Sequence, residues 1–166
     1  NPKSESKRIK FNNIPTYGRH LPKRGILLNN RLGWILMEIP TLILMPYFTF
    51  NGINYPNTVI LCFFSIYMIH YINRTLIFPF RISSKKKKIP IHIVISAALF
   101  NLCNTFFIGY YFGNIAEYKI TWLQTPYFIF GIIIFSIGMY INLKSDTILI
   151  NLRKNNNDDY KIPFGG

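Results

Sequence analysis

Cysteine is scarce in this chain of 166 residues: Cys62 and Cys103 are the two present, and no CxxC pair occurs. Both lie inside apolar runs, in which a thiol packs as a small hydrophobic side chain. A disulfide framework and a cysteine zinc site are therefore not predicted, and we expect no metal site. The sequence also lacks GxGxxG, so the glycine-rich turn of a Rossmann nucleotide-binding domain is not expected.

Acidic residues are scarce as well, with 6 Asp and Glu against 19 Lys and Arg, which leaves a formal net charge of +13. Yet 50% of the residues are hydrophobic, 17% are aromatic, and the mean hydropathy is +0.21. A chain is both basic and apolar when its apolar residues lie in lipid and its Lys and Arg lie in loops. Nucleic-acid binding is not favoured, because the basic residues fall between apolar runs and do not follow one face.

Four apolar stretches predict membrane spans over residues 34–50, 58–80, 91–112 and 126–143. Each approaches the ~20 residues that a helix needs to cross a hydrocarbon core of about 30 Å. The first stretch is the weakest, because it contains Glu38, Pro40 and Pro46. The expected fold is all-α, a polytopic membrane helix bundle.

The segments that flank these stretches alternate in charge. The arm over residues 1–33 is basic, residues 51–57 carry no charge, the second stretch is followed by Arg81 and the lysine run 85–88, and residues 113–125 carry one Glu and one Lys. The tail is basic again. The positive-inside rule then predicts an integral membrane protein with its basic loops and both ends of this chain in the cytosol. The lysine run is a topology anchor on this interpretation, and phosphate contact is the alternative.

Glu38 is costly where it stands, inside the first apolar stretch. A carboxylate near the middle of a bilayer costs about 2.5–3.5 kcal/mol on insertion scales, and less near the interface. Such a residue is either paired inside the bundle or part of a functional site. The sequence alone leaves both interpretations open.

Polar residues also enter the second and fourth stretches. Tyr71 and Arg74 are three residues apart and share a helix face; an interfacial Tyr and a snorkelling Arg are the alternative. On the fourth stretch Asn142, Asp146 and Arg153 fall on one stripe at about 100° per residue. They are suited to hold a ribose hydroxyl, an amide and a phosphate, or else they pair with one another. We expect the polar groups of the separate spans to converge in one cavity open to the cytosol.

Several strings occur in the order and spacing of landmarks of one family, from about Tyr17 to the last residue. They are LMEIPTL (36–42), HYINRT (70–75), GYY (109–111), GMYINLKSD (138–146) with Leu149, Leu152 and Arg153, and YKIPFGG (160–166). Together they resemble the steroid 5α-reductase family. The resemblance implies a membrane fold of seven helices in the endoplasmic reticulum, of which four are in this chain, and an enzyme that reduces a Δ4-3-oxo steroid with NADPH.

The resemblance also implies roles for individual residues. Glu38 and Tyr71 match the catalytic pair that hydrogen-bonds the 3-oxo group of the substrate, and Trp34 matches a residue of the substrate pocket. The positions that match the cofactor site are Asn142, Asp146, Arg153, Tyr160, Lys161 and Arg74. Lys161 stands where some members have Arg. The lysine keeps the positive charge but cannot form the bidentate hydrogen bonds of a guanidinium. Met37 stands beside Glu38 where vertebrate members have a Gln. At this position the chain is similar to the plant-type members.

The resemblance divides the chain into a basic cytosolic arm, 1–33, and a partial membrane reductase domain, 34–166, whose C-terminal spans are missing. On this expectation the chain alone is inactive. The expected partners are an apolar steroid or lipid substrate and membrane lipid, without nucleic acid or metal. Two alternatives stay open: an enoyl-CoA or polyprenal reductase of a neighbouring branch, and a non-catalytic membrane scaffold or transporter.

Overall fold

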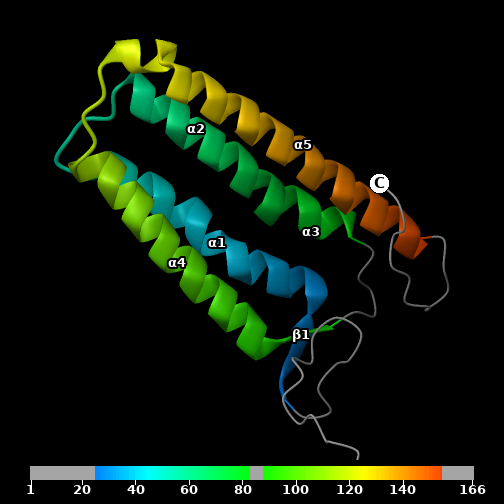
Figure 1. The fold of residues 1–166 in the computed structure, drawn as a ribbon. Helices are drawn as coiled ribbons and strands as arrows, with labels where there is room; N and C mark the ends of the chain where they lie inside the picture. Colours follow the sequence, from blue (N-terminus) through cyan, green and yellow to red (C-terminus); the bar gives the residue numbers. More distant parts are fainter. Residues whose placement is uncertain (1–24, 83–87, 155–166) are drawn as a thin grey trace, which may run out of the picture.

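The computed structural model describes residues 25–82 and 88–154. Helices dominate this part of the chain, and Figure 1 shows the long ones lying side by side. In chain order the elements are β1 (Leu27–Asn29), α1 (Asn30–Phe50), α2 (Thr58–Ile72), the π-helical η1 (Asn73–Ile77), α3 (Phe78–Arg81), β2 (Lys88–Pro90), α4 (Ile91–Asn114), the 3₁₀-helical η2 (Ile120–Gln124) and α5 (Pro126–Lys154).

Four helical segments within the described residues are long and apolar enough to cross a membrane: Asn30–Phe50, Thr58–Arg81, Ile91–Asn114 and Pro126–Asn151. The second consists of α2, η1 and α3 in series. The predicted all-α membrane bundle is thereby confirmed. The division into an arm over residues 1–33 and a membrane domain stays a prediction.

Two helices extend beyond the apolar runs that predict them. Helix α1 begins at Asn30, because the Asn29 side chain accepts hydrogen bonds from the main-chain amides of Arg31 at 2.9 Å and Leu32 at 3.4 Å. Such a cap satisfies amides that have no partner within the helix. Helix α5 continues to Lys154 through the polar stripe that follows residue 143. Pro40 and Pro46 lie inside α1 without ending it.

Helices α1 and α4 form the closest pair. The strands that lead into them, β1 and β2, pair antiparallel with Leu28 opposite Ile89, which places the starts of both helices at one end of the bundle. From there the two helices run in the same direction (Figure 1). Small residues permit the approach: a Cβ on Gly109 would come 2.9 Å from the Cβ of Phe48. Gly109 and Gly113 form a GxxxG pair on α4. Packing through such residues is typical of helices in membranes, where close backbone contact replaces hydrophobic burial.

Helix α5 runs along the α2 segment on the other side of the bundle (Figure 1). At the end where α1 begins, Ile150 of α5 packs in a cluster with Phe78, Ile82 and Trp34. At the opposite end, Phe128 of α5 packs against Phe63 and Trp122, with ring centroids 5.7 and 5.8 Å away. Between these contacts α5 exposes large apolar side chains such as Phe130 and Ile134. That surface is suited to lipid.

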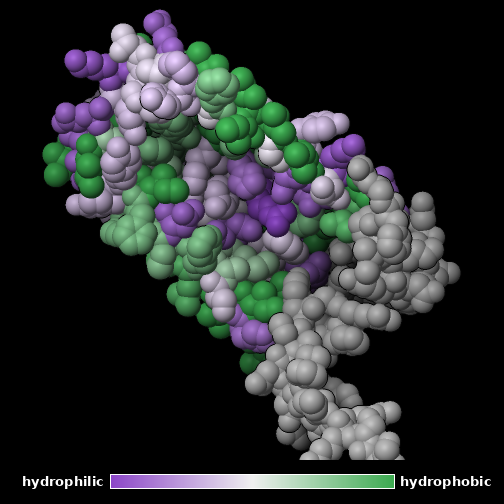
Figure 2. Space-filling view, viewed as in Figure 1, coloured by the Kyte–Doolittle hydropathy of each residue, from purple (hydrophilic) through white to green (hydrophobic). Residues whose placement is uncertain are grey.

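Hydrophilic side chains gather in the furrow between the two helix pairs, flanked by hydrophobic ones (Figure 2). The buried polar residues include Glu38, Asn73, Asn101 and Asp146. They come from all four spans. These polar groups are therefore inside the bundle, while many large apolar side chains are exposed on its outside, as expected of a protein whose solvent is the bilayer.

Candidate functional site

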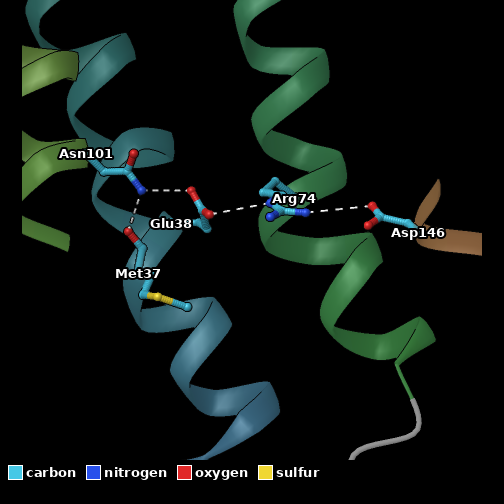
Figure 3. A network of polar contacts seen from close by, with 5 residues as sticks. All are labelled: Met37, Glu38, Arg74, Asn101 and Asp146. Atoms are coloured by element: carbon cyan, nitrogen blue, oxygen red, sulfur yellow. Dashed lines mark hydrogen bonds and ion pairs between the residues drawn. The ribbon is translucent and has the colours of Figure 1, made fainter. Parts of the chain in front are cut away.

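Glu38 is buried on α1, at 9% exposure, and faces α4. The side-chain amide of Asn101 donates to its Oε2 at 2.8 Å, and the same nitrogen donates to the main-chain carbonyl of Met37, also at 2.8 Å (Figure 3). A buried carboxylate is tolerated when donors and a counter-charge replace its water. Asn101 supplies one of these donors.

Arg74 supplies the counter-charge, and it does so for two acids. Its Nε lies 3.6 Å from Oε1 of Glu38, and its Nη1 lies 3.7 Å from Oδ2 of Asp146 on α5 (Figure 3). The side chains of the two acids are each 11% exposed and that of Arg74 is 22% exposed. Residues of three spans are thus joined by one guanidinium, and Asn101 adds the fourth span. Arg74 points between the helices, so the snorkelling alternative is not observed.

Aromatic rings hold the Arg74 guanidinium from the side. Its Cζ lies 4.2 Å from the ring centroid of Trp34 and 4.8 Å from that of Phe78. The two rings themselves meet edge to face at 5.0 Å. A cation over an aromatic face gains about 0.5–2 kcal/mol, the more so when desolvated. Trp34, expected in the substrate pocket, is therefore placed beside the ionic network.

The local sequence accounts for how Arg74 is presented. Pro79 lies five residues after Arg74 on the same span. A proline has no amide hydrogen, and its ring crowds the carbonyl four residues earlier, which here is the carbonyl of Thr75. The chain responds by widening into the π-helical turn η1, Asn73–Ile77, in place of continuing as α-helix. Single π turns are frequent at functional sites. This one brings Asn73 and Thr75 to buried positions beside Arg74.

Tyr71 lies one turn before Arg74 on the same span. Its ring packs on that of Tyr67 at 4.6 Å, with His70 at 5.2 Å on another side. The Tyr67 hydroxyl is 3.2 Å from Oγ1 of Thr105, which donates to Oγ1 of Thr41 at 3.2 Å. Thr41 is one turn beyond Glu38 on α1. Tyr71 is thus supported by a polar layer adjacent to Glu38, and the pairing of these two residues on a ketone stays a prediction.

The polar stripe of α5 has acceptors in excess. Among the described residues, four buried side-chain oxygens lack a hydrogen-bond partner, and Oδ1 of Asn142 and Oδ2 of Asp146 are two of them. The two residues are one turn apart and share a face. Arg81 approaches the same helix, where its Nη2 donates to Oγ1 of Thr147 at 2.7 Å. The stripe is therefore arranged to accept hydrogen bonds beside two cationic side chains.

Some expected site residues are placed only in part. Arg153 falls within α5, and its side chain is not among those described. Tyr160, Lys161 and the first three lysines of the run 85–88 lie outside the described residues. Asn101 is a site residue that sequence reasoning missed. A signal was present: Asn101, Thr105, Gly109 and Gly113 recur at every fourth position of α4, which marks the face against α1.

No metal site accompanies this network within residues 25–82 and 88–154, where no group of three or more His, Cys, Asp and Glu is close enough to hold an ion. The arrangement offers carboxylates, amides, hydroxyls and a guanidinium in a furrow of a membrane bundle. Such groups bind and orient a polar ligand and a polar atom of a lipid-borne molecule. Fold and site thus define a polytopic membrane protein with a buried polar network between its spans.

Comparison with known proteins narrows this class. Residues 87–166 match the sequence model of the family described as 3-oxo-5-alpha-steroid 4-dehydrogenase. The chain is 35% identical over 155 residues to Steroid 5-alpha-reductase DET2 of Solanum lycopersicum, an alignment that covers 90% of this chain and 60% of the relative. It is 35% identical over 157 residues to 3-oxo-5-alpha-steroid 4-dehydrogenase 1 of Homo sapiens, with 90% and 59% covered.

A further relative is 3-oxo-5-alpha-steroid 4-dehydrogenase 1 of Rattus norvegicus, 37% identical over 157 residues, again with 90% of this chain and 59% of the relative covered. The chain spans about 60% of the length of these curated relatives. The predicted resemblance to the steroid 5α-reductase family is confirmed.

Proposed function

We propose that this chain is part of an NADPH-dependent oxidoreductase that reduces the Δ4 double bond of a 3-oxo steroid or a related sterol enone. The relatives bear the names of steroid 5α-reductases, which supports the substrate class. The observation that carries the proposal is the buried network in which Arg74 joins Glu38 on α1 to Asp146 on α5. A carbonyl-binding end and a cofactor-binding end meet in that network.

The cofactor end is the stripe of α5. Among the described residues, Oδ1 of Asn142 has no hydrogen-bond partner, and Oδ2 of Asp146 has only the 3.7 Å ion pair with Arg74. Both oxygens suit a ligand that brings donors, such as the hydroxyls of a ribose or the amino group of a carboxamide. A buried acceptor without a donor costs about 1–3 kcal/mol, which a bound ligand of this kind removes. Both groups belong to a nicotinamide nucleotide, so the residues present fit NADPH.

Other residues of this chain complete the cofactor site in our proposal. Arg153, Tyr160 and Lys161 hold the phosphates and the remainder of the nucleotide, since guanidinium and ammonium groups bind phosphate through charge-assisted hydrogen bonds. Arg74 keeps the Asp146 carboxylate in place on the cofactor side. When bound, NADPH supplies the hydride that the β-carbon of the enone receives.

The carbonyl end is formed by Glu38 and Tyr71. Hydride arrival at the β-carbon places negative charge on the ketone oxygen, and a donor aimed at that oxygen stabilises the enolate-like transition state. The Tyr71 hydroxyl is such a donor, because its unperturbed pKa of about 10 keeps it protonated at neutral pH. Glu38 orients the Tyr71 hydroxyl, or donates to the ketone oxygen itself when burial keeps its carboxyl group protonated. Trp34 provides an apolar wall for the substrate.

The same geometry suggests where the reaction takes place. Each of Glu38, Arg74 and Asp146 lies nearer the end of the bundle at which α1 begins. That end carries Arg31, Arg81 and Lys88. By the positive-inside rule it faces the cytosol, from which a charged cofactor enters, while the substrate arrives through lipid. We place the protein in the endoplasmic reticulum, as the resemblance implies.

The full-length protein in membranes tests the proposal. With NADPH and progesterone-like enones, we expect loss of the enone absorbance together with NADPH oxidation, and with NADH a slower reaction. Enoyl-CoA and polyprenal substrates run in parallel assign the enzyme to a neighbouring branch if they alone are reduced. Inactivity on every steroid enone contradicts the proposed substrate. Failure of NADPH to protect the protein against heat or proteolysis favours the non-catalytic alternative.

A further inference from the structure

Asn101 is an unusual residue for its place. It lies inside α4, a membrane span, and is 7% exposed. Its Nδ2 makes two hydrogen bonds of 2.8 Å to α1, one to the main-chain carbonyl of Met37 and one to Oε2 of Glu38. Polar side chains between membrane helices either associate the helices or serve a site. The geometry of these two bonds distinguishes the roles.

The first bond fixes the direction of the amide. A main-chain carbonyl accepts hydrogen bonds and cannot donate them, so the amide nitrogen of Asn101, and not its oxygen, faces Met37 and therefore also Glu38. The carbonyl of Met37 is held by the backbone of α1. Met37 immediately precedes Glu38. The bond to its carbonyl therefore fixes the Asn101 amide relative to the main chain of α1 at the point from which the carboxylate projects (Figure 3).

The second bond divides the two oxygens of the carboxylate. Oε2 accepts from Asn101 at 2.8 Å, whereas Oε1 lies 3.6 Å from Nε of Arg74. The hydrogen bond is short, and the ion pair is looser. Glu38 is consequently held through Oε2, and Oε1 is the oxygen left toward Arg74 and the furrow.

We propose that Asn101 is a positioning residue for the reaction: it holds Glu38 through Oε2 so that Oε1, as the oxygen that carries the proton of the carboxylic acid, is presented to the substrate carbonyl. This inference rests on the proposed function, since it assigns Asn101 a role through Glu38. It adds a residue of α4 to a site whose other members come from the remaining spans. Asn101 itself touches neither substrate nor cofactor.

The packing of α4 supports a precise fit at this position. One turn further along the same face, Thr105 donates to Thr41 at 3.2 Å, and a Cβ on Gly109 would meet that of Phe48 at 2.9 Å. The helix pair therefore leaves little freedom for Asn101 to shift relative to Glu38. A displacement of about 1 Å of a reacting group can cost a hundredfold in rate.

A double-mutant cycle on the full-length protein tests the inference. Asn101→Ala removes the donor and matches the small residues of its face; Glu38→Ala removes the carboxylate. We expect Asn101→Ala to lower kcat about ten- to a hundredfold, with the KM for the enone and the protection by NADPH changed little. In the Glu38→Ala protein the same substitution should have almost no further effect, because Asn101 then has no carboxylate to hold.

Two further variants separate positioning from helix association. Gly109→Ala disturbs the same helix pair away from Glu38, so it should lower thermal stability without a specific loss of kcat. If the Asn101→Ala protein no longer binds NADPH, the cycle is measured with Asn101→Leu, which also lacks a donor. A difference infrared band assigned to the Glu38 carboxylate by Glu38→Gln should shift in Asn101→Ala and stay in place in Gly109→Ala.

The outcomes discriminate between the two proposals. If the wild-type enzyme is active and the losses of kcat from Asn101→Ala and Glu38→Ala are fully additive in the double variant, the role of Asn101 is overturned. The proposed function then still stands. An unshifted carboxylate band has the same meaning. A wild-type protein that reduces no enone overturns the proposed function, and the assigned role of Asn101 falls with it.

Discussion

Arg74 and Asp146 are neighbours across two spans, with Nη1 of the one 3.7 Å from Oδ2 of the other. The same guanidinium faces Glu38 at 3.6 Å. Two acids therefore share one cation. The ion pair with one acid fixes the position of the Arg74 guanidinium relative to the other acid. In the proposed reductase this arrangement couples the geometry of the carbonyl end to that of the cofactor end.

We predict that Glu38→Gln or Tyr71→Phe in the full-length protein lowers turnover at least about tenfold. Tyr71→Phe removes the donor to the ketone oxygen as charge develops on it, and Glu38→Gln removes the carboxyl group that assists this donor. NADPH binding should persist in both variants. Steady-state rates at saturating NADPH provide the measurement, and NADPH protection provides the control. Turnover unchanged in both variants refutes the assigned roles.

Asp146→Ala and Asn142→Leu are expected to weaken NADPH binding by about tenfold or more, since each removes an acceptor worth at least 1.4 kcal/mol to a ligand donor on this proposal. Titration of NADPH against heat denaturation measures the change. Ser145→Ala is the matched control, because Ser145 lies between these residues on α5 and is exposed. Equal affinity in all three variants excludes this stripe as the cofactor site.

Arg74→Gln should lower the thermal midpoint of the protein in detergent. It leaves the buried carboxylates of Glu38 and Asp146 without a counter-charge, and breaking a buried pair costs about 3–5 kcal/mol, less where a side chain is partly exposed as here. Arg74→Lys should recover part of the loss, because it keeps the charge but not the planar contact with Trp34. Recovery by Asp146→Asn in the Arg74→Gln background would confirm that charge imbalance is the cause.

Gly109→Val should destabilise the α1–α4 pair, because its side chain has to enter space that the Cβ of Phe48 occupies. Gly138→Val is the matched control on α5, where a Cβ meets nothing within 4 Å among the described atoms. Thermal midpoints of the two variants in one detergent provide the comparison. A larger loss at Gly138 than at Gly109 contradicts the helix pairing.

The parts of the fold that could be predicted are those with local causes. The number of spans follows from runs of apolar residues, and Glu38, Arg74 and Asp146 stand out because charges are expensive in lipid. Their placement toward the same end of the bundle follows from the alternation of basic and uncharged loops. The start of α1 at Asn30 was missed, because a capping Asn29 acts over a few residues and leaves no trace in hydropathy.

The sequence by itself determined that this is a membrane helix bundle with ionisable groups in its interior, because a residue's affinity for lipid depends little on its partners. Only the tertiary structure decided that Arg74 bridges two acids and that Asn101 holds Glu38. Those contacts depend on which helices are neighbours and in what register, and small residues such as Gly109 set both through close packing that no single segment specifies.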